Sequence, residues 1–333
     1  MQVASARAHQ AEAAAYAADA ARMPTLDASA GVSRSRLAKD QDPRGQGDAY
    51  ATVRNIGASF NYNFDLWGGQ RAAWEAALGQ ARAAEVDQQA ARLTLAANVA
   101  KAYSDLGQAH IVRDLANDDL KRTRQMLDLS KRRLSSGIDS EYQYQQTESL
   151  EASSQSQLID AEKQLQSAKI ALAVLLGKGP DRGGELTRPN VLKPSAVAVP
   201  SVLPAELLGR RPDLIAARWR VEAASKNVAA SKTRFYPNLN LSASAGAESL
   251  LGDAMFGSAS RFFSIAPTIS LPIFDGGRLR ADLDARDADY DLAVAQYNKT
   301  LVQALGDIGN SLMQLRETGR QSRAQQPAAD IAQ

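Results

Sequence analysis

The chain has 333 residues, and its 39 lysine and arginine residues nearly balance 37 aspartate and glutamate residues, which gives a formal net charge of +2. A chain with so little net charge lacks the positive electrostatic potential expected of a nucleic-acid-binding protein. The sequence has no cysteine and two histidines, which excludes a disulfide framework, a cysteine nucleophile and thiolate metal sites. No apolar run reaches the roughly 18 to 20 residues of a transmembrane helix.

The first segments predict a helix followed by a β-hairpin. Residues 1–22 are polar and alanine-rich and fit a helix that begins without a capping residue or a leader. Residues 23–67 alternate between apolar and small polar side chains, the period of two that indicates β-strands. The stretch 39–47, which contains proline and glycine, is predicted to connect the two strands. We expect residues to be missing before Met1 and also at the other end of the chain, which stops in helix-compatible sequence.

The next segment predicts an unusually long helical hairpin over residues 68–176. Apolar residues recur there at the spacing of a coiled coil, among them Leu106, Leu165, Leu172 and Leu176. The first helix contains no proline up to about Ser136. At about 1.5 Å per residue this helix is roughly 100 Å long. The tip of the hairpin is predicted near 135–140. Residues 177–203 follow as a linker, whose Gly-Lys-Gly start lacks the spacing and flanking elements of a phosphate-binding loop.

The remaining segments repeat the first half in the same order. We predict a helix over 204–236, a second β-hairpin over 237–275 with its connection at 252–260, and a long helix over 276–333 that stops before a tip. The sequence Phe-Asp-Leu-Trp-Gly-Gly beginning at Phe64 returns as Phe-Asp-Gly-Gly-Arg beginning at Phe274. The chain is therefore predicted to contain an incomplete duplication of helix, strand, strand and long helix.

The alternating segments have two interpretations. A soluble antiparallel sheet with one face on a core shows the same alternation. A transmembrane sheet is favoured by the small, mostly uncharged polar set and by four aromatic residues near one end of the strands, Phe64, Trp67, Tyr236 and Phe274, which would form an interfacial girdle. Four strands cannot close a barrel, and an open edge in lipid is forbidden. The membrane interpretation thus requires several chains to share one barrel.

Five segments resemble the TolC-type outer-membrane efflux protein family, especially its lipoprotein channel branch. They are Leu-Leu-Gly-Arg-Arg-Pro-Asp-Leu at 207–214, the alanine-rich run into Phe-Tyr-Pro at 229–237, the strand exits at 64–68 and 274–278, and Lys-Arg-Arg-Leu-Ser-Ser-Gly-Ile-Asp-Ser at 131–140. No single segment is decisive. Together they follow the order of the family over nearly the whole chain.

This resemblance implies an α+β membrane protein. Long helices would form a coiled-coil barrel through the periplasm, and four strands per chain would contribute to a trimeric 12-stranded transmembrane β-barrel in the outer membrane. The protein would be a passive exit duct for drugs and other toxic small molecules, docked to a periplasmic adaptor and an inner-membrane pump. The leader and acylated cysteine of the lipoprotein branch are absent from this sequence, and the gating region of the second tip is missing.

The resemblance also assigns a docking role to the hairpin tip. Arg133, Gly137 and Ser140 would contact the adaptor, although Arg133 is also compatible with a solvated charge at a helix end. Gly137 is needed for the turn under either interpretation.

Other functional classes are weaker. His9 and His110 occupy polar helical segments with no nucleophile or metal spacing around them and are expected at the surface, and three aspartates at 114, 118 and 119 fit a solvent face. We therefore predict no enzyme activity, no metal site and no cofactor. A structural coiled-coil or adhesin protein would explain the helices but not the duplicated hairpins. A type I protein secretion duct stays open as an alternative within the family.

Overall fold

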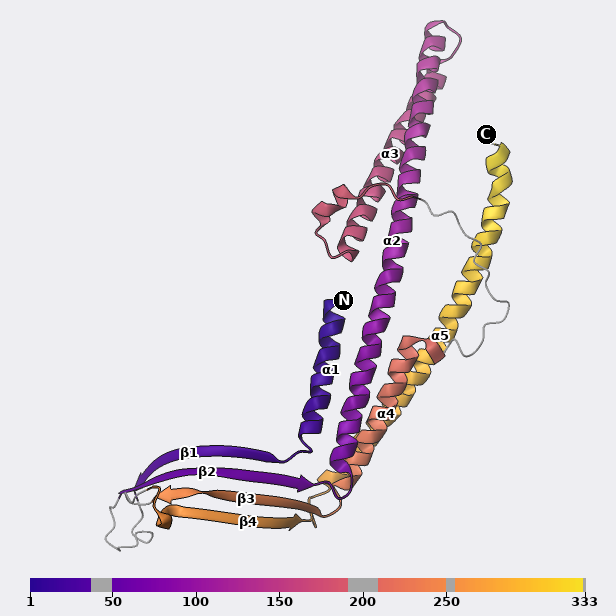
Figure 1. The fold of residues 1–333 in the computed structure, drawn as a ribbon. Helices are drawn as coiled ribbons and strands as arrows, with labels where there is room; N and C mark the ends of the chain where they lie inside the picture. Colours follow the sequence, from indigo (N-terminus) through magenta and orange to yellow (C-terminus); the bar gives the residue numbers. More distant parts are fainter. Residues whose placement is uncertain (37–49, 191–208, 250–254, 332–333) are drawn as a thin grey trace. The chain divides into compact units, whose positions relative to one another are not determined.

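The computed structural model describes residues 1–36, 50–190, 209–249 and 255–331 (Figure 1). The chain divides into two compact units, Met1–Gln89 with Pro204–Gln333, and Ala90–Leu203. The described elements follow the order α1 (Gln2–Ala20), β1 (Thr25–Arg36), β2 (Tyr50–Phe64), α2 (Gly69–Ser135), α3 (Glu141–Leu175), η2 (Pro180–Glu185), α4 (Pro212–Thr233), β3 (Asn238–Ser249), η4 (Ser258–Ser260), β4 (Arg261–Ser270) and α5 (Arg278–Ile331). Helix α2 contributes residues to both units.

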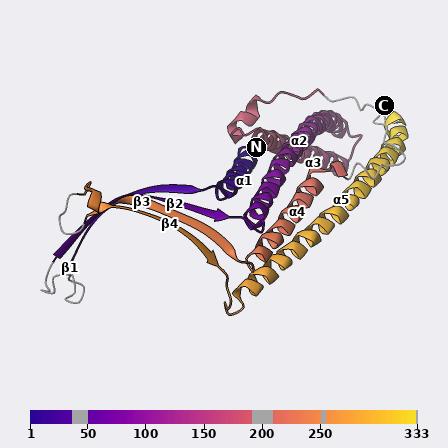
Figure 2. The same ribbon diagram turned by 60° about the horizontal axis from the view of Figure 1, so that its bottom comes forward.

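The first unit contains a four-stranded antiparallel sheet in the order β1-β2-β3-β4 (Figure 2). The outer pairs, β1 with β2 and β3 with β4, are the two hairpins expected from the alternation. The central pair, β2 with β3, joins the two repeats. The expected connection at 39–47 lies outside the described residues, as does part of the one at 252–260, which ends in the short turn η4.

Two strands end earlier than their alternation suggests. Apolar residues continue to Leu66 and to Ile273 in the sequence, but β2 ends at Phe64 and β4 at Ser270. Pro272 lacks the N–H that a strand ladder needs, and the chain then turns through Gly276 and Gly277 with φ of 66° and 88°. The glycines thus redirect the chain from the sheet into helix α5.

The helices of the first unit pack through alanine. Ala76 and Ala83 of α2, Ala216 and Ala223 of α4 and Ala304 of α5 are almost fully buried. At Gly79 an added Cβ would lie 3.1 Å from the Cβ of Ala223, so α2 and α4 approach closely. Small side chains allow this approach, and the alanine-rich composition therefore produces thin helical layers.

Helix α4 is shorter than the expected helix over 204–236. It begins at Pro212, and the residues before 209 lie outside the described part of the chain. Proline fits the first turn because its missing N–H would have no helical partner there. Asp213 in the same turn complements the helix dipole.

The second unit is an antiparallel helical hairpin. Helix α2 has 67 residues in total and α3 has 35. Leu106, Leu165 and Leu172 form its buried core, and Leu186, which follows η2, packs against them. Leu176, which the heptad spacing placed in this core, is 48% exposed because it is the C-cap of α3. No described helix is both long enough and apolar enough to span a membrane.

Candidate functional site

The sheet has one continuous apolar face. Residues directly opposite each other in neighbouring strands share a face, and the register brings the apolar sets of all four strands together. This apolar face carries Leu26, Ala28, Ala30, Val32, Ile56, Ala58, Phe60, Tyr62, Phe64, Leu239, Leu241, Ala243, Ala245, Ala247, Phe263, Ile265 and Ile269. Leu26, Phe263 and Ile265 are 75%, 85% and 70% exposed. Such a large exposed apolar surface marks contact with lipid or with another chain.

The opposite face of the sheet is polar. It carries Asp27, Ser29, Ser33, Asn55, Ser59, Asn61, Asn63, Asn240, Ser242, Ser244, Glu248, Ser264 and Thr268. Phe262 is an exception on this face, because its ring covers two glycines of neighbouring strands. A Cβ at Gly57 would lie 3.7 Å from its Cζ, and one at Gly246 would lie 3.1 Å from its Cε1. Small polar side chains leave this face compatible with a wet interior.

The four expected interface aromatics lie at the end of the sheet that leads into the helices. Trp67 stacks on Tyr236 with ring centroids 4.9 Å apart, and its Nε1 donates a 2.8 Å hydrogen bond to the carbonyl of Pro237. Phe64 contacts the ring of Tyr62 edge-on at 4.8 Å. Phe274 follows β4 and is 92% exposed. The Trp67–Tyr236 stack ties the exit of the first hairpin to the entry of the second.

Two aspartates that sequence reasoning did not single out cap the long helices. Asp65 accepts hydrogen bonds from the backbone N–H of Gln70 and Arg71 at 3.0 and 2.8 Å. Asp275 accepts them from Gly277 and Leu279 at 3.0 and 2.9 Å. The N–H of Leu279, followed by that of Gly277, holds the pKa of Asp275 below its ordinary value. The Phe-Asp pair that precedes glycine in both halves of the sequence could have indicated these two capping residues.

A pocket of about 540 Å³ lies between these capped helix starts and the sheet. Its lining includes Trp67, Arg234 and Arg278, together with Gln70, whose buried Oε1 has no partner. The pocket combines aromatic and cationic groups with one carboxylate, Asp65, which accepts the backbone N–H bonds of α2.

The Arg-Pro-Asp motif at the start of α4 connects this helix to α5. Arg211 lies 2.7 Å from Asp213 and 3.5 Å from Asp307 of α5, and it also donates to the carbonyl of Ala304 at 3.4 Å. Bonding to Arg211 lowers the pKa of Asp213. The motif that carried part of the family resemblance therefore has a structural role between two helices.

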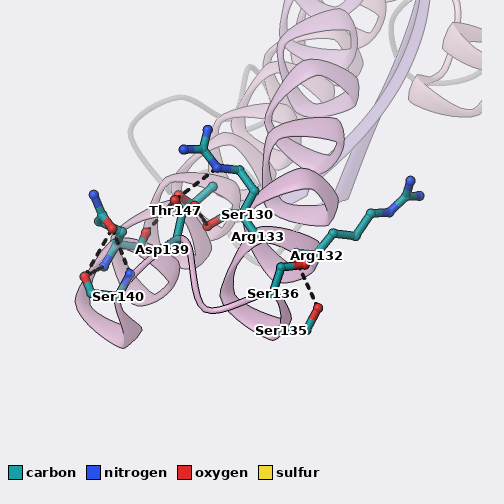
Figure 3. A network of polar contacts seen from close by, with 9 residues as sticks. Ser130, Arg132, Arg133, Ser135, Ser136, Asp139, Ser140 and Thr147 are labelled. Atoms are coloured by element: carbon teal, nitrogen blue, oxygen red, sulfur yellow. Dashed lines mark hydrogen bonds and ion pairs between the residues drawn. The ribbon is translucent and has the colours of Figure 1, made fainter.

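The tip of the second unit contains the three expected docking residues, and Figure 3 shows the polar contacts around two of them, Arg133 and Ser140. Gly137 has φ of 73° and reverses the chain after α2. Ser140 caps α3 in a reciprocal capping box with Gln143. Arg133 lies 3.1 Å from Asp139, and Arg133 is about half exposed whereas Asp139 is only 12% exposed. Each of these residues thus supports the turn, and the guanidinium of Arg133 stays accessible.

One expectation about histidine is wrong. His9 is exposed and lies 3.6 Å from Glu12, as a surface residue should, but His110 is 8% exposed and neither ring nitrogen has a hydrogen-bond partner. It is buried because it follows Leu106 by one helical turn, on the face that packs in the hairpin. Within the described residues no group of three or more histidine, cysteine, aspartate or glutamate side chains could hold a metal ion.

A sheet with one apolar and one polar face, continued by helices of this length, fits the class of outer-membrane channel proteins. Comparison with known proteins agrees with this class. The family model described as outer membrane efflux protein matches residues 1–178 and 203–333, so the chain belongs to the outer membrane efflux protein family. This confirms the family resemblance and the α+β fold. The unmatched residues fall within the expected linker.

Individual relatives are named as resistance or efflux proteins. The chain is 35% identical over 292 residues to the fusaric acid resistance protein FusA of Burkholderia cepacia, covering 85% of this chain and 54% of that protein. It is 32% identical to the probable efflux pump outer membrane protein SepC of Pseudomonas putida, covering 93% and 64%. The chain thus spans about half to two thirds of the length of these curated relatives.

Solved structures show the same fold. The outer membrane protein VceC of Vibrio cholerae superposes with a TM-score of 0.86 at 33% identity, over 94% of this chain and 75% of that chain. The Campylobacter jejuni CmeC channel superposes with a TM-score of 0.86 at 24% identity, over 92% and 66%. The second similarity bears on the fold alone.

Proposed function

We propose that the chain is the outer-membrane channel component of a tripartite efflux system, a passive exit duct rather than an enzyme. The observation that carries this proposal is the sheet register, which separates a continuous apolar face from a face of small polar side chains. The apolar face suits lipid and the polar face suits a wet pore. The long helices that follow the sheet would extend the pore into the periplasm.

The duct requires several copies of the chain. Strands β1 and β4 end the sheet order, so each leaves a row of backbone N–H and C=O groups unpaired within the described sheet. In lipid these groups must find partners. Pairing β4 of one copy with β1 of the next satisfies them, and three copies with four strands each give the 12-stranded barrel of a homotrimer.

The hairpin tip is the proposed docking site for the periplasmic adaptor, which would link the duct to an inner-membrane pump. We expect Arg133→Glu to weaken capture of the adaptor about tenfold, because it reverses a half-exposed charge at the tip. The matched control is Arg132→Glu, since the side chain of Arg132 points away from Asp139 (Figure 3) and pairs with Asp128.

A second variant separates docking from folding of the tip. The exchange Arg133→Asp with Asp139→Arg keeps an ion pair across the turn but moves the positive charge. If Arg133 itself contacts the adaptor, the exchange variant still fails to capture it. Undiminished capture by Arg133→Glu would contradict the docking role.

The proposed cargo is small toxic organic molecules, the class suggested by the names of relatives such as the fusaric acid resistance protein. Loss of the gene should raise sensitivity to organic acids, solvents, dyes or antibiotics, and the native gene should restore resistance. Fractionation should place the chain in the outer membrane. Unchanged sensitivity together with loss of a secreted protein would instead indicate a protein secretion duct.

A further inference from the structure

The far end of the apolar face, away from the helices, is basic. Arg34 of β1, Arg54 of β2 and Arg261 of β4 lie on this face, because each is opposite or two residues from a member of the apolar set. All three side chains are exposed. No acidic residue shares this face within the described strands. Arg36 lies on the same face but has another interaction, and the inference does not depend on it.

The arginines begin where the apolar band ends. From Phe64 to Ile56 the β2 positions on this face are uncharged, a length of about 26 Å at about 3.3 Å per residue. A strand tilt of about 40° reduces this to about 20 Å along the membrane normal, near the roughly 25 Å apolar band of outer-membrane barrels. Arg261 is in the same row as Ile56, and Arg54 and Arg34 lie in the next rows outward. All three therefore reach the membrane surface.

These arginines have no carboxylate partner among the described residues. The guanidinium of Arg34 lies 5.3 Å from the ring centre of Tyr50. Exposed guanidinium groups without acidic partners, next to an apolar surface, fit an anionic amphiphile, because the planar guanidinium binds phosphate oxygens in a bidentate manner. Strand geometry puts neighbouring arginines about 8 to 12 Å apart, so that they can reach separate phosphates of one headgroup.

We propose that Arg34, Arg54 and Arg261 bind the phosphates of the outer-leaflet glycolipid, lipid A. This inference rests on the proposed function, in which the helices occupy the periplasm and the opposite end of the sheet therefore lies in the outer leaflet. Lipid A carries two phosphates on a disaccharide above several acyl chains. Its acyl chains would cover the apolar face while its phosphates meet the arginines. In a closed trimer the arginines would form a basic belt around the outer rim of the barrel.

Native mass spectrometry of the full chain in a non-ionic detergent tests the proposal. The probes are bisphosphorylated lipid A, phosphate-free lipid A and phosphatidylglycerol. We expect bisphosphorylated lipid A to bind at least about tenfold more tightly than either of the others, and added salt to reduce this preference. Equal binding of phosphorylated and phosphate-free lipid A overturns the proposal. Equal binding of phosphatidylglycerol overturns the assignment to the glycolipid.

Matched variants assign the effect to these three residues. The triple variant Arg34→Gln, Arg54→Gln and Arg261→Gln should lose the preference. The control Arg92→Gln, Arg280→Gln and Arg316→Gln removes the same charge from exposed helical positions and should keep it. The triple lysine variant at the sheet positions retains the charge and should keep most of the preference. Its binding would show that substitution of these three positions does not by itself prevent folding. An unchanged preference in the folded glutamine variant overturns the proposal.

This outcome is independent of the test of the duct itself. Fractionation and drug sensitivity of the native chain report on the proposed function, whereas lipid preference reports on the arginines. A chain that reaches the outer membrane and restores resistance but does not distinguish lipid A would refute the lipid site alone.

Discussion

Two aspartates with the same local role mark equivalent points of the two repeats. Asp65 and Asp275 each accept two backbone N–H bonds at the start of a long helix. We expect Asp65→Ala to lower the free energy of unfolding by about 1 kcal/mol, because the first N–H groups of α2 lose their acceptor. Asp65→Asn retains an oxygen acceptor and should cost less. Thermal unfolding of the three proteins measures the difference, and equal midpoints for alanine and asparagine would rule out the capping role.

His110 makes the stability of the second unit depend on pH. Burial lowers the pKa of His110, and the positive charges of Lys169, Arg113 and Arg188 lower it further, against an opposing effect of Asp114. The unfolded chain, with an ordinary pKa of about 6.5, therefore binds the proton first as the pH falls. The free energy of unfolding therefore does not change with His110 at a pH well above 6.5. It falls as the pH drops from the unfolded-state pKa toward the lower folded-state pKa.

The substitution His110→Leu should remove this dependence. It also eliminates two buried nitrogens that lack partners, so the variant should gain more stability at pH 5 than at pH 8. Urea unfolding at both values measures the gain. His9→Leu serves as the control, because His9 is exposed and should give no such difference. A gain for His110→Leu that is the same at both values would contradict the explanation.

At the scale of elements, the join between the repeats depends on two glycines. An added Cβ at Gly246 would lie 2.8 Å from the Cα of Gly57 and 3.1 Å from the ring of Phe262. Gly246→Val should therefore separate β2 from β3 and destabilise the sheet by about 1 to 3 kcal/mol. Gly179→Ala is the control, since nothing lies within 4 Å of its Cβ position. Unfolding monitored by the exposure of Trp67, at one end of this sheet, reports the change.

The elements themselves could be predicted from periodicity, whereas their exact ends and partners could not. Alternation located all four strands, and coiled-coil spacing located the core leucines Leu106, Leu165 and Leu172. The start of α4 at Pro212 and the end of β4 at Ser270 depend on proline and on local hydrogen bonds. Proline and local hydrogen bonds act independently of the hydrophobic pattern, so the periodicity does not show where these elements begin or end.

The candidate site was also only partly predictable from the sequence. The positions of the four aromatic residues and of the turn at Gly137 could be predicted, because aromatic residues are scarce in this composition and glycine interrupts the helical pattern. Burial of His110 and the pairing of Arg133 with Asp139 were missed, because both depend on which face of α2 meets the returning chain. The basic end of the apolar face was also missed, since it appears only when the register of four strands places separate arginines on one surface.

At the scale of the whole molecule, the proposed trimer can be tested through the absence of cysteine. Within one chain β1 and β4 are separated by two strands, which is about 14 Å. A disulfide requires Cα atoms within about 7 Å, so cysteines on these two strands can bond only between chains. We expect Ser29→Cys, combined in turn with a cysteine at Ser264, Ala266 or Thr268, to give covalent dimers and trimers after mild oxidation.

All four of these positions lie on the polar face of the sheet, and moving the second cysteine along β4 accommodates the unknown register between copies. Each single-cysteine variant should stay monomeric on a denaturing gel, because equivalent strands of different copies do not meet around a closed barrel. A ladder that continues past the trimer would indicate open, head-to-tail association. Failure of every pair to cross-link in the membrane-inserted protein would contradict the shared barrel, since the edges of β1 and β4 would then lack partners in lipid.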